Sequence, residues 1–135
     1  MSKWKFMRFV GDDDEDVVTA WIAACRPPNL AKAVKARLDA IVAHMETCEH
    51  IAPGAYTTPL RGYPDIFEIG LQVKGAQYRP LCCHGPGDHE VTILVMAIER
   101  GDRFEPPTAP TIAQDRKALI HFDRRYVRGY YSRKA

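Results

Sequence analysis

The feature that most constrains the fold of this chain is a change in the spacing of its apolar residues. Between residues 30 and 45 they recur every three or four positions, as in an amphipathic helix. After the loop 52–59 they alternate instead, in three runs of strand length, at 65–73, 77–83 and 90–98. The turns Lys74-Gly75-Ala76 and Gly85-Pro86-Gly87-Asp88 join these runs and are short enough to favour hairpins. This half of the chain therefore predicts an antiparallel meander.

The first half predicts one strand and two helices. Residues 4–10 are short and rich in aromatic side chains, which is typical of a strand. The acidic run 12–16 favours a helix start, because aspartate caps free N–H groups and complements the helix dipole. Arg26-Pro27-Pro28 ends that helix, and Pro28 suits the first turn of the next. We expect the second helix to end near His50.

The last part of the chain predicts a third helix and a basic tail. A proline-rich connection at 105–110 precedes a helix that we expect from about Thr111 toward Tyr126, with the basic tail from about residue 124. Residues 1–135 are thus interpreted as a single domain of α+β class. Its expected architecture is an N-terminal strand and two helices packed on a small antiparallel sheet, with a C-terminal helix.

The charges of the chain are concentrated at two poles. The net charge is only +2, but residues 116–135 hold seven Lys or Arg against one acid. The opposite pole is the acidic run 12–16. A basic end of this kind can attract a polyanion such as RNA, or it can be a solvated helix face and tail. Both interpretations stay open at this point.

The four cysteines indicate a reducing compartment. The sequence has no apolar stretch suited to a signal peptide or a membrane span, so we expect a cytoplasmic protein with no membrane partner. Two groups raise the alternative of structural zinc: His44, Cys48 and His50, and a second group at Cys82, Cys83, His84 and His89. Neither has the Cys-x-x-Cys spacing of a zinc site, so we expect no metal and no cofactor. A nucleophilic role for Cys82 or Cys83 is a further alternative without a supporting motif.

The order of short motifs from residue 60 to about 119 resembles the RelE/HigB toxin superfamily, in particular its phage-derived branch with an extended helical N-terminal half. The motifs are Leu60-Arg61-Gly62, Phe67-Glu68-Ile69, Gln77-Tyr78-Arg79, an apolar strand at 91–98, and a Thr/Pro segment before a helix. The resemblance implies a toxin that cuts mRNA without a metal, often on the ribosome, and that an antitoxin protein neutralises.

Two departures from the family pattern bear on activity. Gly70 stands where the family usually has an arginine, and the segment 98–103 replaces two adjacent lysines of the family with alternating acidic and basic residues. The alternative to an active endoribonuclease is therefore a catalytically impaired RelE-fold protein, of phage or toxin origin, that binds RNA or a protein partner.

Cleavage by the ribose 2′-OH needs fixed cations, a base and an acid. Arginine suits the first role because it stays charged and grips two phosphate oxygens. The expected catalytic residues are Arg79, Arg61, His84 and Tyr126, with His89 and His121 as further candidates for proton transfer. The expected RNA-binding residues are Arg100, Arg103, Arg124, Arg125, Arg128 and Tyr130. The alternatives are an outward-facing strand arginine at 79 and tail tyrosines that pack back onto the sheet.

Overall fold

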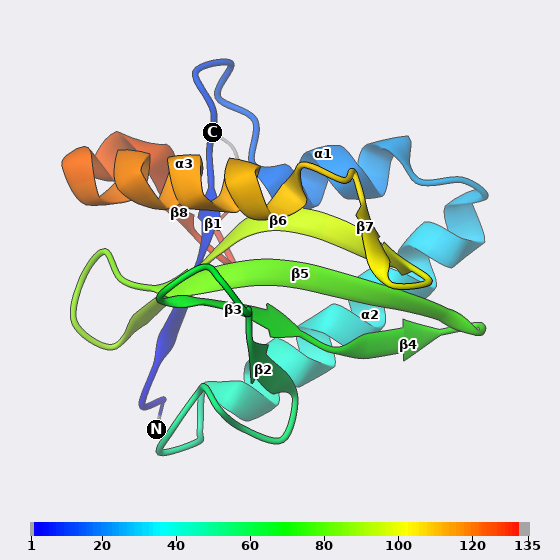
Figure 1. The fold of residues 1–135 in the computed structure, drawn as a ribbon, viewed down its shortest axis with the longest axis horizontal. Coiled ribbons are helices and arrows are strands. Elements are labelled where there is room, and N and C mark those ends of the chain that lie inside the picture. Colours follow the sequence, from blue (N-terminus) through cyan, green and yellow to red (C-terminus); the bar gives the residue numbers. More distant parts are fainter. Residues whose placement is uncertain (1, 133–135) are drawn as a thin grey trace.

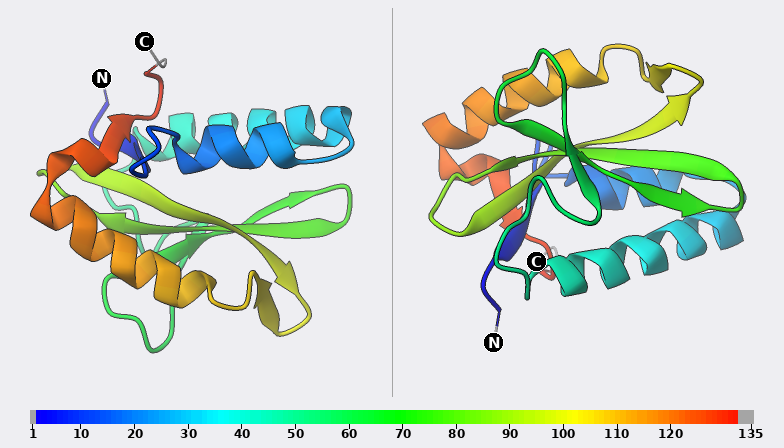
Figure 2. Two further views of the ribbon diagram at one scale, coloured as in Figure 1. Left: turned by 90° about the horizontal axis from the view of Figure 1, so that it is seen from above. Right: turned by 60° about the horizontal axis from the view of Figure 1, so that its bottom comes forward.

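A twisted mixed sheet runs through the middle of this protein, with helices on both of its faces (Figure 1, Figure 2). The structure is a computed structural model and describes residues 2–132. In chain order the elements are β1 (Lys5–Phe9), α1 (Val17–Ala24), α2 (Pro28–Met45), β2 (Thr57–Pro59), β3 (Ile66–Ile69), β4 (Leu71–Val73), β5 (Ala76–His84), β6 (Glu90–Arg100), β7 (Arg103–Glu105), α3 (Ala109–Phe122), a 3-10 turn (Arg124–Tyr126) and β8 (Val127–Gly129).

The sheet has the order β2-β3-β5-β6-β1-β8, with β4 also beside β5 and β7 also beside β6. Its centre is the long antiparallel hairpin of β5 and β6, in which Gln77 pairs with Glu99 and His84 with Val91. β1 lies parallel to β6, and β8 is antiparallel to β1. The last strand, β8, is thereby hydrogen-bonded to the first strand, β1.

The expected α+β class is confirmed, with an N-terminal strand, two helices and a C-terminal helix around a sheet. The sheet is mixed rather than wholly antiparallel, because β1 enters it between β6 and β8. The expected strand 65–73 is divided at Gly70 into β3 and β4. The second helix ends at Met45 rather than near His50, and residues 127–129 form a strand instead of a tail.

Local sequence signals explain where the first two helices begin. The side chain of Asp16 caps α1 by accepting a hydrogen bond from the backbone N–H of Thr19 at 2.8 Å. Pro28 occupies the first turn of α2, where a backbone N–H would have no partner within the helix, so the N–H that proline lacks is not needed.

Within residues 2–132, no helix combines the length and the apolar character that a membrane crossing requires.

The sheet separates two apolar cores. α1 and α2 cover one face and α3 covers the other, as the view from above shows (Figure 2). The first core contains Val18, Val34 and Leu38 from the two helices, all fully buried. The second contains Leu81 and Leu94 from the central hairpin, together with apolar residues of α3. Both faces of the central hairpin are thus held rigidly by packing.

Leu38→Ala tests the first core. Leu38 is 0% exposed on the inner face of α2, so its truncation leaves a cavity and is expected to lower the free energy of unfolding by about 2–5 kcal/mol. Lys32→Ala, on the exposed side of the same helix, is expected to change it by less than about 0.5 kcal/mol. Urea denaturation followed by circular dichroism measures both. Equal effects of the two substitutions would contradict this assignment of the helix faces.

Candidate functional site

Arg79 lies between two glutamates on the central part of the sheet. Its Nε atom is 3.5 Å from Oε1 of Glu68 and 3.6 Å from Oε1 of Glu99. The strand register explains the grouping: Glu68 is opposite Leu81 and Glu99 is opposite Gln77, so both are diagonal neighbours of Arg79. The Arg79 side chain is 16% exposed. One guanidinium is therefore shared by two carboxylates.

A hollow of about 190 Å³ opens beside this group. Its lining comes from the loop before β2, from β2 itself and from the two strands of the ion pairs: Gly54, Ala55, Tyr56, Thr57, Thr58, Glu68, Gly70 and Arg79. The N–H of Gly70 donates to the carbonyl oxygen of Tyr56 at 2.8 Å, which fixes the loop against the sheet. A Cβ atom at residue 70 would lie 3.5 Å from Nη1 of Arg79. The glycine thus leaves room beside the guanidinium that a larger side chain would fill.

The surroundings of Glu68 make its carboxyl group readier to hold a proton than an ordinary glutamate. Burial raises the pKa of Glu68, Arg79 opposes that rise, and the negative charge of Glu99 adds to it. The side chain still has 21% of its surface exposed. The hollow therefore joins a cation to a carboxyl group that can exchange a proton.

Two of the other expected catalytic residues, Arg61 and His84, do not line the hollow beside Arg79. Arg61 is exposed in the loop between β2 and β3. His84 ends β5, five residues beyond Arg79 and so about 16 Å along the strand. Its ring lies 5.4 Å from that of Trp4 and 5.3 Å from that of Phe67. Arg61 and His84 are not drawn into one cluster with Arg79.

His84 borders a second, more apolar hollow of about 260 Å³. The remaining lining residues are Ala52, Pro59, Leu60, Tyr63, Pro64, Asp65, Ile66 and Phe67. Burial lowers the pKa of His84, and the nearby charge of Asp65 opposes this shift only in part. His84 is therefore mainly neutral at pH 7, in a state that can accept a proton.

The two tyrosines of the C-terminal segment are built into the protein. Tyr126 is 8% exposed, and its ring stacks on Phe9 with the centroids 6.0 Å apart. Tyr130 is 4% exposed, and its hydroxyl donates to Asp39 of α2 at 2.5 Å. Burial and this carboxylate raise the pKa of Tyr130 well above its ordinary value. This placement matches the alternative in which the tail tyrosines pack back onto the sheet, because their rings fill space between the sheet and its helices.

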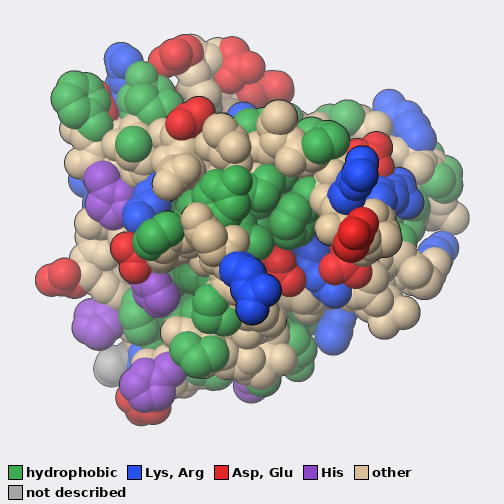
Figure 3. Space-filling model, viewed as in Figure 1, with side chains coloured by type: hydrophobic (Ala, Val, Ile, Leu, Met, Phe, Trp, Pro, Cys, Tyr) green, Lys and Arg blue, Asp and Glu red, His purple; other side chains and the backbone are tan. Residues whose placement is uncertain are grey.

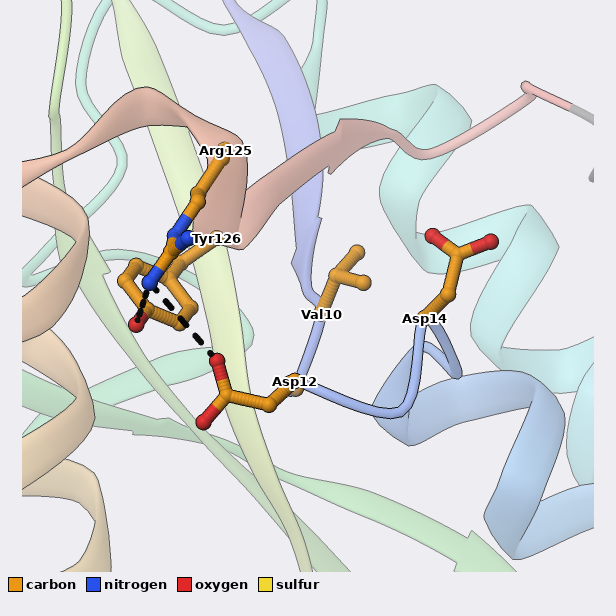
Figure 4. A pocket seen from close by; sticks show the side chains of 6 residues that line it. Val10, Asp12, Asp14, Arg125 and Tyr126 are labelled. Atoms are coloured by element: carbon orange, nitrogen blue, oxygen red, sulfur yellow. Dashed lines mark hydrogen bonds and ion pairs between the residues drawn. The ribbon is translucent and has the colours of Figure 1, made fainter.

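The basic tail is paired with acidic side chains. Arg128 lies 2.7 Å from Asp14, and Arg125 lies 3.8 Å from Asp12. Figure 4 shows Arg125 beside the ring of Tyr126 and reaching toward Asp12 on the loop after β1. Arg124 makes two hydrogen bonds of 3.1 Å to the carboxylate of Glu90. The two charge poles of the sequence therefore meet through Arg125 and Arg128.

A buried ion pair anchors this contact. Arg8 of β1 lies 3.5 Å from Asp16, and their side chains are only 8% and 5% exposed. Arg8 also donates to the carbonyl oxygen of Gly129 at 3.2 Å, which ties β1 to the C-terminal segment. Arg128 approaches the same carboxylate at 3.9 Å. Nothing in the sequence points to Arg8, because a single arginine in an apolar strand carries no recognisable motif.

Arg100 and Arg103 lie at the far end of the central hairpin. Nε of Arg100 donates to Glu105 at 2.7 Å, while the side chain of Arg103 is exposed opposite Arg100 across β6 and β7. Figure 3 shows basic and acidic side chains intermixed over this end of the sheet. Neither arginine lines the hollow at Arg79.

Among residues 2–132, no three His, Cys, Asp or Glu side chains gather closely enough to hold a metal ion. Glu68 and Glu99 are the site residues that sequence reasoning missed. Both could have been found only from the pairing register of three neighbouring strands, which places them beside Arg79.

Comparison with protein-family models, curated proteins and solved structures gives no significant match to this chain.

The environment of Cys82 and Cys83 tests the cysteine alternative. Both thiols are fully buried, and burial raises the pKa of Cys83 to about 12 and that of Cys82 well above its ordinary value. Because the thiolate is the reactive form, neither is expected to react with a thiol reagent at pH 8 in the native protein. The partly exposed Cys25 and Cys48 are the internal controls and are expected to react. Mass spectrometry after labelling, with and without denaturant, measures this, and native labelling of Cys82 or Cys83 would contradict it.

Proposed function

We propose that this protein is a RelE/HigB-like toxin that cleaves mRNA on the ribosome without a metal. Its site is the hollow beside Arg79, it acts in the cytoplasm, and an antitoxin protein neutralises it. The observation that supports this proposal best is the position of Arg79. It is held on a rigid central strand, next to an open hollow and a carboxyl group with a raised pKa.

The chemistry of RNA cleavage matches what this hollow offers. A fixed guanidinium can grip the scissile phosphate and stabilise the charge that grows on its oxygens. Arg61 is exposed on the loop that leads to β3, and it is free to contact the RNA backbone outside the hollow. The order of elements, with a strand and two helices before the sheet and a helix after it, is the order that the family resemblance implies.

A second candidate function is binding without cleavage. It is favoured by the two carboxylates that share Arg79 and by Gly70, which supplies no second cation at the hollow. Arg124, Arg125 and Arg128 add little free positive charge, because all three are paired with acids. In this version the fold binds RNA or a protein partner and has lost the ability to cut.

Inducible expression of the chain in bacteria separates the two functions. We expect growth arrest and new 5′ ends in translated mRNA, and we expect Arg79→Ala to lower cleavage by at least about 100-fold, because one fixed donor to the transition state is worth that much. Arg26→Ala is the matched control, since this exposed arginine is not among the expected RNA-binding residues and does not line the hollow. Normal growth and intact mRNA with abundant folded wild-type protein would contradict cleavage.

Gly70→Arg tests the departure from the family directly. The site of the new Cβ has only ordinary van der Waals contact with Arg79, so the substitution is expected to fold and to place a second cation at the hollow. We expect stronger growth arrest than in the wild type, or arrest where the wild type causes none. Gly70→Gln fills the same space without the charge and is expected to give no gain. An equal effect of both substitutions would show that charge at this position is irrelevant.

A further inference from the structure

We propose that Glu68 is the general base of the cleavage reaction and that Arg79 is its electrostatic partner, an assignment that rests on the proposed function. Phe67-Glu68-Ile69 is one of the motifs that carry the family resemblance, but the motif by itself gives Glu68 no chemical role. The geometry does distinguish it. Its carboxylate lies 3.5 Å from the cation that would hold the phosphate, and it lines the open hollow in which a ribose would lie.

The proton and the bonds balance with this one group. The carboxylate of Glu68 takes the proton of the 2′-OH while the 2′ oxygen forms a bond to phosphorus. The bond from phosphorus to the 5′ oxygen breaks, and that oxygen takes a proton from water. The proton held by Glu68 then passes to the hydroxide left behind, so that water is re-formed and Glu68 is again a carboxylate. The products are a 2′,3′-cyclic phosphate and a 5′-hydroxyl end. No oxidant, reductant or co-reactant is needed.

The shared guanidinium gives this arrangement an advantage over two independent groups. Before the reaction, the charge of Arg79 is partly satisfied by the carboxylate of Glu68. When Glu68 accepts the proton it loses its negative charge, and Arg79 is then free to stabilise the negative charge that grows on the phosphate oxygens. The cation thus interacts more strongly with the transition state than with the bound substrate, which is the condition for catalysis.

Glu68 is better suited to this role than the other carboxylate on Arg79. Glu99 lies at a similar distance, 3.6 Å, but it is not part of the hollow's lining, and its side chain is 39% exposed against 21% for Glu68. Arg79 and Glu99 are the charged groups that act on Glu68, and Tyr56, Thr57 and Thr58 complete the polar lining. Glu99 therefore helps to keep Glu68 basic without reaching the substrate.

The test compares Glu68→Gln with Glu99→Gln in the full chain. Purified protein is incubated with ribosomes programmed with an end-labelled mRNA, and cleavage rates are measured from pH 5 to pH 8. We expect Glu68→Gln to lower the rate by about 100- to 10,000-fold, the usual contribution of a general base. Glu99→Gln is expected to lower the rate far less than Glu68→Gln, because Glu99 acts on Glu68 and Arg79 only through its charge and does not line the hollow.

Two further readouts separate a base from a structural residue. The wild-type rate is expected to rise with pH through the raised pKa of Glu68, and the residual rate of Glu68→Gln is expected to lose this dependence. Glu68→Asp keeps a carboxylate and is expected to retain the pH dependence at a lower rate. Thermal unfolding checks that all three variants are folded.

The outcomes separate this inference from the proposed function. Wild-type cleavage that persists unchanged in folded Glu68→Gln would remove Glu68 from the mechanism and leave the nuclease intact. Equal losses in Glu68→Gln and Glu99→Gln would assign both glutamates to holding Arg79 in place and would also overturn the inference. Absence of cleavage by wild-type protein and by Gly70→Arg would overturn the proposed function, and the general base with it.

Discussion

The position of β1 inside the sheet determines most of the architecture. Because β1 lies between β6 and β8 while the next strand, β2, lies at the opposite edge, the chain must cross the sheet between them, and α1 and α2 make that crossing on one face. The opposite face is then left for α3. β1 still has a second side with free backbone groups, which β8 covers. The pairing of Arg8 with Asp16 fastens this junction from within, since the carboxylate that holds Arg8 also caps α1.

The pairing of β8 with β1 also determines which charged side chains of the chain lie together. With β8 beside β1, the basic tail is brought against the acidic loop that follows β1, and Arg128 and Arg125 are paired with Asp14 and Asp12. Exposed pairs of this kind contribute little to stability, but they remove positive charge that a polyanion could use. Within residues 2–132, Arg125 and Arg128 of the tail therefore add little to the positive field that RNA could meet.

The sequence predicts the individual helices and strands better than it predicts which strands pair with each other in the sheet. Helical spacing located α2, and turn residues located the β5–β6 hairpin, because these signals are local. The parallel contact of β1 with β6 and the strand β8 depend on pairings far apart in the sequence, which no local pattern encodes. The same limit applies to the site. Arg79 was accessible to motif reasoning, whereas Glu68 and Glu99 become its neighbours only through the register of β3, β5 and β6. Tyr126 and Tyr130 lie in a segment whose mixture of arginine and tyrosine is typical of an RNA-binding tail. Only the structure shows that both side chains are buried.

Arg79 and its two glutamates carry both candidate functions, and the balance between these functions is electrostatic. With both carboxylates ionised, the group has a net negative charge and disfavours a phosphate. A proton on Glu68 brings that net charge to zero, and burial together with the charge of Glu99 raises the pKa of this carboxyl group above that of an ordinary glutamate. An arginine at residue 70 would supply a second positive charge directly, but here a glycine leaves the hollow open. In this chain the proton that Glu68 takes up removes a negative charge beside the phosphate but adds no positive charge, so Arg79 remains the cation that lines the hollow.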